Sequence, residues 1–322
     1  MSSKALAIPS PVNLASLVER AKEYAADARA SSTRKAYESD FRAFEQWCSA
    51  QGLVAMPAPP AAVAVYLTHL ADSGRKVATI ERALTGIVHA HRTRGVDWPR
   101  AHPAIANVMA GIRRRVGTAP AQKAPVVDEL LAAMLATLDE DLRGLRDRAL
   151  LTLGWSGAFR RSELVAIDHE HLRFDAAGVT IRIPRSKADQ EGKGADVTLP
   201  RMRGDDTCPV GALELWLTRA KIRRGPVFRA ITRHGTMEER LSPAGVRDIL
   251  LRRAAQAKLT VHPTERLSPH GLRAGFITEA YLAGAPDEQV AQHSRHADLS
   301  SMRGYRRRAR ITADNPARLL DL

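Results

Sequence analysis

Apolar residues recur every three or four positions in the first third of the chain, a spacing that places them on one side of an α-helix. One such stripe ends near Gly52 and consists of Tyr37, Phe41, Phe44 and Trp47. Similar stripes occupy 62–74 and 77–95, each ending at a glycine, and a fourth follows Pro103. The pattern predicts a small helical bundle in which these stripes form the core.

The stretch 117–125 interrupts this pattern. It contains two prolines and one glycine, and its apolar residues have no regular spacing, which is typical of an extended linker. We therefore expect a first domain over 1–116 and a second over 126–322.

The second domain is also predicted to be mostly helical. Helical periodicity appears in 128–138 and 143–155 and dominates again from Ser242 onward. The clear β signal lies in 178–200, where apolar and polar residues alternate on both sides of a glycine-containing turn. The expected fold is mainly α, with a helical N-terminal bundle and a helical second domain that contains a small antiparallel hairpin.

Charge narrows the choice of partner. The 322 residues include 49 Lys and Arg against 35 Asp and Glu, a formal net charge of +14. Such an excess favours a polyanion, and nucleic acid first, although a basic surface can also serve solubility or attract anionic membranes.

The positions of the cysteines and histidines suggest neither a disulfide nor a metal site. Cys48 and Cys208 lie far apart, which argues against a disulfide framework or a thiolate cluster and fits a reducing cytoplasm. His169 and His171 have a spacing that a metal could use, but no second ligand cluster accompanies them, so we predict no metal. The sequence has no signal-peptide pattern and no run of eighteen apolar residues, so we expect neither secretion nor a membrane span.

Several polar residues in the second domain have spacings that suit phosphate chemistry. Arg160 and Glu163 are three residues apart, so on a helix a carboxylate could orient a guanidinium. His270 and Arg273 have the same spacing, which presents an imidazole and a second guanidinium from one helical turn. Each pair alone is a weak signal, and surface ion pairs of this kind are common. Two convergent arginines nevertheless indicate a phosphate ligand.

The full ordered set is more specific. It consists of Arg160 with Glu163, Lys187 in the hairpin, His270 with Arg273, and His296 nine residues before Tyr305. This set resembles the active site of the tyrosine recombinase (phage integrase) family, in its compact Cre-like and Xer-like form. The helical N-terminal part and the closing segment are similar too, so the resemblance covers nearly the whole chain.

The resemblance implies a helical core-binding domain and a catalytic domain that together clamp DNA. It implies that Tyr305 attacks the scissile phosphodiester and forms a 3′-phosphotyrosyl bond, with no cofactor and no ATP. Arg160 and Arg273 would stabilise the negative charge of the phosphorane. Site-specific DNA strand exchange is the expected activity.

The resemblance assigns the proton transfers as well. Lys187 would act as the general acid for the leaving 5′-oxygen, and His270 would help to accept the tyrosyl proton. His296 would hydrogen-bond the phosphate. Glu163 would orient an arginine or a histidine without touching DNA, a supporting role.

One residue departs from the family pattern. The family commonly has glycine directly before the histidine that precedes the tyrosine, where this chain has Arg295. The departure makes His293 a rival of His296, but the distance to Tyr305 favours His296. Lys193 is the weaker rival of Lys187.

Specificity for DNA is expected mainly from the first domain. The segment 75–82 could place Lys76, Thr79 and Arg82 along a helix that faces a DNA groove, although a solvated helical face explains them nearly as well. The expected partner is double-stranded DNA with paired recognition sites.

The last residues suggest an assembly. Leu319, Leu320 and Leu322 form an apolar tail that, by resemblance, docks in a neighbouring protomer of a tetramer on DNA. Two alternatives remain open: a catalytically silent DNA-binding regulator, and a topoisomerase of the tyrosine type.

Overall fold

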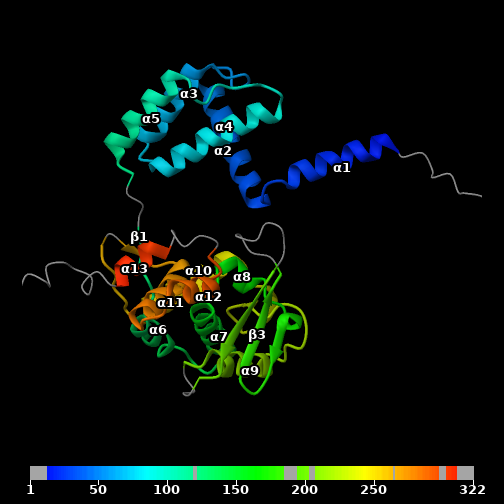
Figure 1. Cartoon of the computed structure of the whole chain (residues 1–322), viewed down its shortest axis with the longest axis vertical. Helices are drawn as coiled ribbons and strands as arrows, with labels where there is room; N and C mark the ends of the chain where they lie inside the picture. Colours follow the sequence, from blue (N-terminus) through cyan, green and yellow to red (C-terminus); the bar gives the residue numbers. More distant parts are fainter. Residues whose placement is uncertain are drawn as a thin grey trace, which may run out of the picture. The chain divides into compact units, whose positions relative to one another are not determined.

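The chain divides into two compact units, Met1–Pro120 and Ala121–Leu322 (Figure 1). The computed structural model describes residues 13–118, 122–184, 194–202, 207–263, 265–296 and 302–309. The division falls inside the stretch 117–125 that the sequence suggests as a linker. Helices dominate both units and the sheets are small, so the prediction of a mainly α fold is confirmed.

The described part of the first unit consists of helices and their connections. They are α1 (Leu14–Asp27), α2 (Ser31–Ala50), α3 (Pro60–Asp72), α4 (Val77–Thr93) and α5 (Pro103–Val116). Helix α2 packs against α4, and α3 packs against α5. Phe41 and Phe44 of the predicted stripe are buried in the common core, and Trp47 packs against it. The four helices that periodicity predicts are therefore present.

Helix α1 precedes the first predicted apolar stripe and was not predicted from the sequence. Asn13 caps it, accepting a hydrogen bond from the Ser16 amide at 3.2 Å. Its apolar side chains, such as Leu14 and Tyr24, remain exposed. Local helix propensity and the cap therefore account for this helix, without help from burial.

The second unit is organised around helix α7. Its helices are α6 (Asp128–Leu135), α7 (Leu142–Ser156), α8 (Arg161–Val165), η1 (His169–His171), α9 (Pro209–Arg219), α10 (Pro243–Gln256), α11 (His270–Leu282), α12 (Asp287–Ser294) and α13 (Arg303–Ala309). Most residues of α7 are buried, and α9 and α11 both pack against it. A helix buried on several sides gives the site a rigid base.

In the described residues, three small sheets accompany these helices. The predicted hairpin is present as β3 (Gly178–Ile183) and β4 (Ala195–Pro200), and a third antiparallel strand, β2 (Leu172–Phe174), extends it. The strands β5 (Arg229–Ile231) and β6 (Met237–Arg240) pair with each other, and β1 (Gln122–Lys123) runs parallel to β7 (Glu265–Arg266). Lys187 and Lys193 lie between β3 and β4, outside the described residues.

Two glycines allow the chain to cross the face of α11 beside the site. The amide of Val126 donates to the carbonyl of Gly271 at 2.8 Å, and the indole of Trp155 donates to the carbonyl of Val126 at 2.8 Å. A Cβ on Gly275 would collide with the backbone carbonyl of Val126. Since Gly271 and Gly275 are one helical turn apart, both belong to the face that this segment covers.

Substitution of Gly275 by alanine is therefore expected to destabilise the second unit. The obstacle is backbone and not the end of a flexible side chain, so the free energy of unfolding should fall by about 3 kcal/mol or more. Denaturant titration would measure the change. Gly111→Ala in α5 is the control, because a Cβ there meets nothing within 4 Å and alanine favours a helix. Equal stability of the two variants would contradict this packing.

Candidate active site

The structure brings together all the predicted catalytic residues that it describes. They come from four separate segments of the second unit. Arg160 is the N-cap residue of α8, His270 and Arg273 lie in the first turn of α11, His296 follows α12, and Tyr305 lies in α13. The position of Lys187 is not among the described residues.

The tyrosine hydroxyl and His270 are in direct contact. The hydroxyl of Tyr305 lies 2.9 Å from Nε2 of His270, a distance at which the hydroxyl can donate to a neutral imidazole. Although His270 is at the surface, desolvation and the charges of Arg273, Lys123 and Arg160 lower its pKa. The ring is therefore neutral at pH 7 and can accept the tyrosyl proton.

Arg273 is almost fully buried, with 1% of it exposed, and hydrogen bonds hold its guanidinium in place. Its Nη1 donates to the carbonyl of Ala158 at 2.7 Å, and its Nη2 lies 3.2 Å from Nε2 of His296. Burial, followed by the charges of Arg160 and Arg295, lowers the pKa of Arg273 to about 9. The group is still cationic at pH 7, but nearby protein groups only partly compensate its charge.

Arg160 is steered by Glu163, as the spacing suggests, but with a different local geometry. Arg160 precedes the helix as its cap instead of lying within it, and its amide donates to Oε2 of Glu163 at 3.0 Å. Its Nη1 pairs with Oε1 of the same carboxylate at 2.6 Å, with side-chain exposures of 23% and 1% for Arg160 and Glu163. The partly exposed guanidinium thus has a fixed direction.

Charge in this site is unbalanced. Three guanidiniums, those of Arg160, Arg273 and Arg295, surround the single carboxylate of Glu163. Burial opposes ionisation of Glu163, but Arg295 and Arg160 outweigh it and lower the pKa of that carboxyl. With neutral histidines, the cluster carries two uncompensated positive charges, which suits an anion with several acceptor oxygens, such as a phosphodiester.

His296 belongs to this cluster, whereas His293 faces away. Nδ1 of His296 lies 2.7 Å from the hydroxyl of Ser294, which itself donates to the carbonyl of Val290. These contacts favour a tautomer with the proton on Nδ1. The ring of His293 stacks on Phe276, and its Nε2 bonds the carbonyl of Ser156. The geometry supports the choice of His296 from the sequence.

Acid pH should destabilise the folded protein through His296. Burial, then Arg273 and Arg160, lowers the pKa of His296 from 6.5 to about 4. Between these values the unfolded chain binds a proton that the folded chain does not, so the free energy of unfolding falls as pH decreases from 6.5 to 4. Denaturation across this range should give a shallower slope for His296→Gln, and identical slopes would contradict the prediction.

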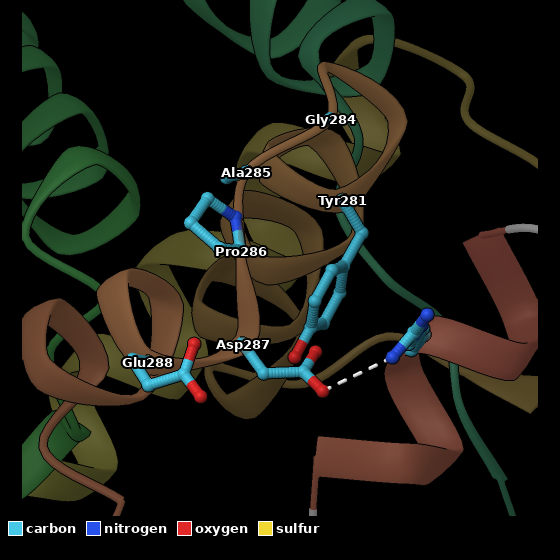
Figure 2. A pocket seen from close by; sticks show the side chains of 7 residues that line it. Tyr281, Gly284, Ala285, Pro286, Asp287 and Glu288 are labelled. Carbon is cyan, nitrogen blue, oxygen red and sulfur yellow. Dashed lines mark hydrogen bonds and ion pairs between the residues drawn. The ribbon is translucent and has the colours of Figure 1, made fainter.

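The helix that carries Tyr305 is anchored one residue after that tyrosine. Nη1 of Arg306 pairs with Oδ2 of Asp287 at 3.1 Å, which ties α13 to the start of α12. Figure 2 shows the ring of Tyr281 beside this pair, with its hydroxyl directed toward Asp287. Burial and Asp287 raise the pKa of Tyr281 to about 12. Tyr281 and Tyr305 also belong to one apolar cluster between α11 and α13.

Two contributors to this site were not expected. Arg295 lies among the predicted catalytic residues, and Ser294 hydrogen-bonds the ring of His296. The sequence signals Arg295 because it replaces a glycine that is typical of the family. Nothing in the sequence distinguishes Ser294 from other serines.

The proposed DNA-binding residues lie on or beside α4 in the first unit. Lys76 is the cap of α4, and both Lys76 and Arg82 are exposed. Arg82 makes a two-pronged ion pair with Asp40, through Nε and Nη2 at 2.9 and 3.0 Å. Binding of Arg82 to DNA would therefore compete with this pair.

Across the described ranges, no group of three or more histidine, cysteine or acidic side chains is arranged to hold a metal. Within the same ranges, no helix combines the length and the apolar character that a bilayer crossing needs.

Comparison with known proteins defines the family. Residues 126–310 match the Phage integrase family. An integrase/recombinase XerD homolog from Selenomonas ruminantium is 36% identical over 302 residues, which cover 92% of this chain and 87% of that protein. The fold is similar to XerH recombinase in a post-cleavage complex with difH, with a TM-score of 0.60 and 18% identity over 82% of this chain and 73% of that one. The fold is also similar to a lambda integrase tetramer bound to a Holliday junction, with a TM-score of 0.58 and 16% identity over 92% of this chain and 78% of that one. By its family match and its relative, this chain belongs to the phage integrase family of tyrosine recombinases.

Proposed function

We propose that the chain breaks and rejoins DNA strands with Tyr305 as its nucleophile. Membership of the family confirms that it is a site-specific DNA recombinase, and the proposal assigns the chemistry to residues. One observation carries it: the Tyr305 hydroxyl lies 2.9 Å from a histidine base inside a cluster of uncompensated arginines. The arrangement supplies a nucleophile, a proton acceptor and an anion site together.

In the proposed reaction, the Tyr305 oxygen attacks the scissile phosphorus while its proton passes to Nε2 of His270. Arg160 and Arg273 bind the non-bridging oxygens and stabilise the charge of the phosphorane. The 5′-oxygen leaves as a hydroxyl with a proton from Lys187, and a 3′-phosphotyrosyl bond remains. Attack by the 5′-hydroxyl of a partner strand reverses these steps, so no external energy source is needed.

His296 changes its hydrogen-bonding role in this scheme. Nη2 of Arg273 lies 3.2 Å from Nε2 of His296 and 3.1 Å from Nδ1 of the same ring. A bound phosphate would offset the arginine charges that depress the pKa of His296, so the ring could take up a proton and donate to a phosphate oxygen. Phosphate binding and protonation of His296 should therefore reinforce each other.

The first unit is proposed to bind the DNA core site, with Lys76, Thr79 and Arg82 as candidate contacts. The net charge of +14 supports a polyanionic partner. The proposed tetramer follows from the lambda integrase tetramer bound to a Holliday junction, to which this chain is similar in fold. In that assembly the tail, 310–322, would dock on a neighbouring protomer. We place the reaction in the bacterial cytoplasm, at the nucleoid.

Strand exchange between two labelled DNA fragments from the protein's own genetic neighbourhood tests this function. A recombinase joins the labels of fragments that carry paired sites and leaves fragments with scrambled sites unchanged. Relaxation of supercoiled DNA without such sites would favour a topoisomerase. Binding without covalent adducts, even on nicked substrates that trap cleavage, would favour a silent regulator.

A further inference from the structure

Arg295 occupies a backbone position that normally belongs to glycine. It ends α12 with φ 57° and ψ 46°, in the left-handed region. A side chain with a Cβ is disfavoured there, so glycine would stabilise the backbone better. The arginine side chain is nevertheless 8% exposed and packed among the catalytic segments. Any benefit of this residue must therefore come from its guanidinium.

The guanidinium joins three catalytic segments. Its Nη1 donates to the carbonyls of Gly157 and His293 at 3.1 and 2.8 Å. Its Nη2 donates to the carbonyl of Ala158 and to Oε2 of Glu163, both at 3.0 Å. It also stacks 4.9 Å from the centre of the Phe159 ring. The turn before Arg160 and the segment that leads to His296 are thus fastened to one planar group.

Two of these acceptors are shared with the phosphate-binding arginines. The carbonyl of Ala158 also accepts from Nη1 of Arg273, and the carboxylate of Glu163 also binds Nη1 of Arg160. Ala158 itself has a φ of 45°, so a strained turn presents this carbonyl. Arg295 therefore fixes the groups that orient Arg160 and Arg273.

Charge gives the arrangement a further effect. Among these arginines, Arg160 and Arg295 form ion pairs with the buried carboxylate of Glu163, so without Arg295 both carboxylate oxygens would attract the guanidinium of Arg160. With Arg295 on Oε2, Arg160 is bound through Nη1 to Oε1. Nη2 of Arg160 also donates to the carbonyl of Arg295 at 3.5 Å, and the other N–H groups of this guanidinium can turn to a phosphate.

We propose that Arg295 is a positioning residue that shares Glu163 with Arg160 and Ala158 with Arg273, and so keeps both arginines directed at the phosphate. The proposal rests on the assignment of Arg160 and Arg273 as phosphate ligands. It predicts an effect on the rate of DNA cleavage and little effect on DNA affinity, because Arg295 itself does not contact DNA.

The test compares Arg295→Gly with the full-length wild type on suicide DNA substrates in single-turnover cleavage. We expect the rate constant to fall about 100-fold, the loss that misplacement of a reacting group by an ångström can cause, with the Kd for DNA within about twofold. Lys258→Gly is the matched control, because Lys258 also has a positive φ of 52° and its exposed side chain lies outside the site. It should cleave at the wild-type rate.

Two further variants separate positioning from structure. Arg295→Lys keeps the charge and loses the planar set of donors, so we expect an intermediate rate even if the glycine variant folds poorly. Glu163→Gln should slow cleavage in the wild type but much less in the Arg295→Gly background, because the two residues act as a unit. Additive effects would show independent roles.

Three results would overturn the inference: wild-type cleavage by both Arg295 variants, a loss of DNA affinity equal to the loss of rate, or additivity with Glu163→Gln. Failure of the proposed function has a different signature, since the wild-type protein itself would then form no covalent adduct.

Discussion

Tyr305→Phe is expected to abolish the covalent protein–DNA adduct while leaving DNA binding within about twofold of wild type. The variant keeps the ring, which packs in the apolar cluster between α11 and α13, and removes only the hydroxyl that contacts His270. That hydroxyl lies 2.9 Å from Nε2 of the proposed base, so its removal leaves no oxygen there to attack phosphorus. Detergent-quenched gels and band-shift titrations would measure the two quantities.

The control for this prediction is Tyr281→Phe. That substitution also removes a tyrosine hydroxyl between α11 and α13, beside the Arg306–Asp287 pair. It should leave adduct formation intact. Adducts in the Tyr305 variant, or their loss in both variants, would contradict the assignment of the nucleophile.

Arg273→Lys is expected to lower the cleavage rate by at least about 100-fold, the typical cost of removing one donor from a charge-stabilising site. Lysine keeps the charge but cannot hold the carbonyl of Ala158 and present a second donor in one plane. Single-turnover cleavage at saturating protein measures this effect separately from binding. The loss should persist at every pH from 6 to 8.

Arg253→Lys provides a matched comparison. Arg253 is also a buried arginine, paired with Asp147 at 2.7 Å in a network with Arg146 and Arg252. Lysine there should lower stability without a comparable loss of cleavage below the unfolding temperature. A similar loss of cleavage in both variants would mean that the effect at Arg273 is structural.

Helices were the most predictable part of the fold. Burial of Phe41, Phe44, Ile80 and Ile105 follows from their spacing alone, because a helix needs one apolar face wherever it packs. Strand β2 was not predicted, because an alternation of apolar and polar residues cannot be recognised over three positions. Helix α1 was not predicted, because it packs no apolar stripe into a core.

The site was predictable from order and spacing, with the help of a family resemblance. Spacing of three residues placed His270 and Arg273 on one helical turn, which the structure bears out. That four distant segments converge is a property of tertiary packing, which periodicity does not contain. The role of Lys187 stays a prediction.

Arg295 shows a further limit of sequence reasoning. A positive φ strains the backbone of a non-glycine residue, and contacts of the side chain must offset that strain. For Arg295 these contacts are with the carbonyls of Gly157 and Ala158 and the carboxylate of Glu163. The sequence revealed the missing glycine but not these partners. A departure from a family pattern is therefore a reason to examine what the new side chain contacts.

The most direct test of the account is to identify the amino acid that becomes joined to DNA. Wild-type protein would be trapped on a nicked substrate, digested with protease and nuclease, and the adducted peptide sequenced by mass spectrometry. We expect a nucleotide joined through its 3′-phosphate to Tyr305. Attachment to another residue, or DNA binding with no adducted peptide, would contradict it.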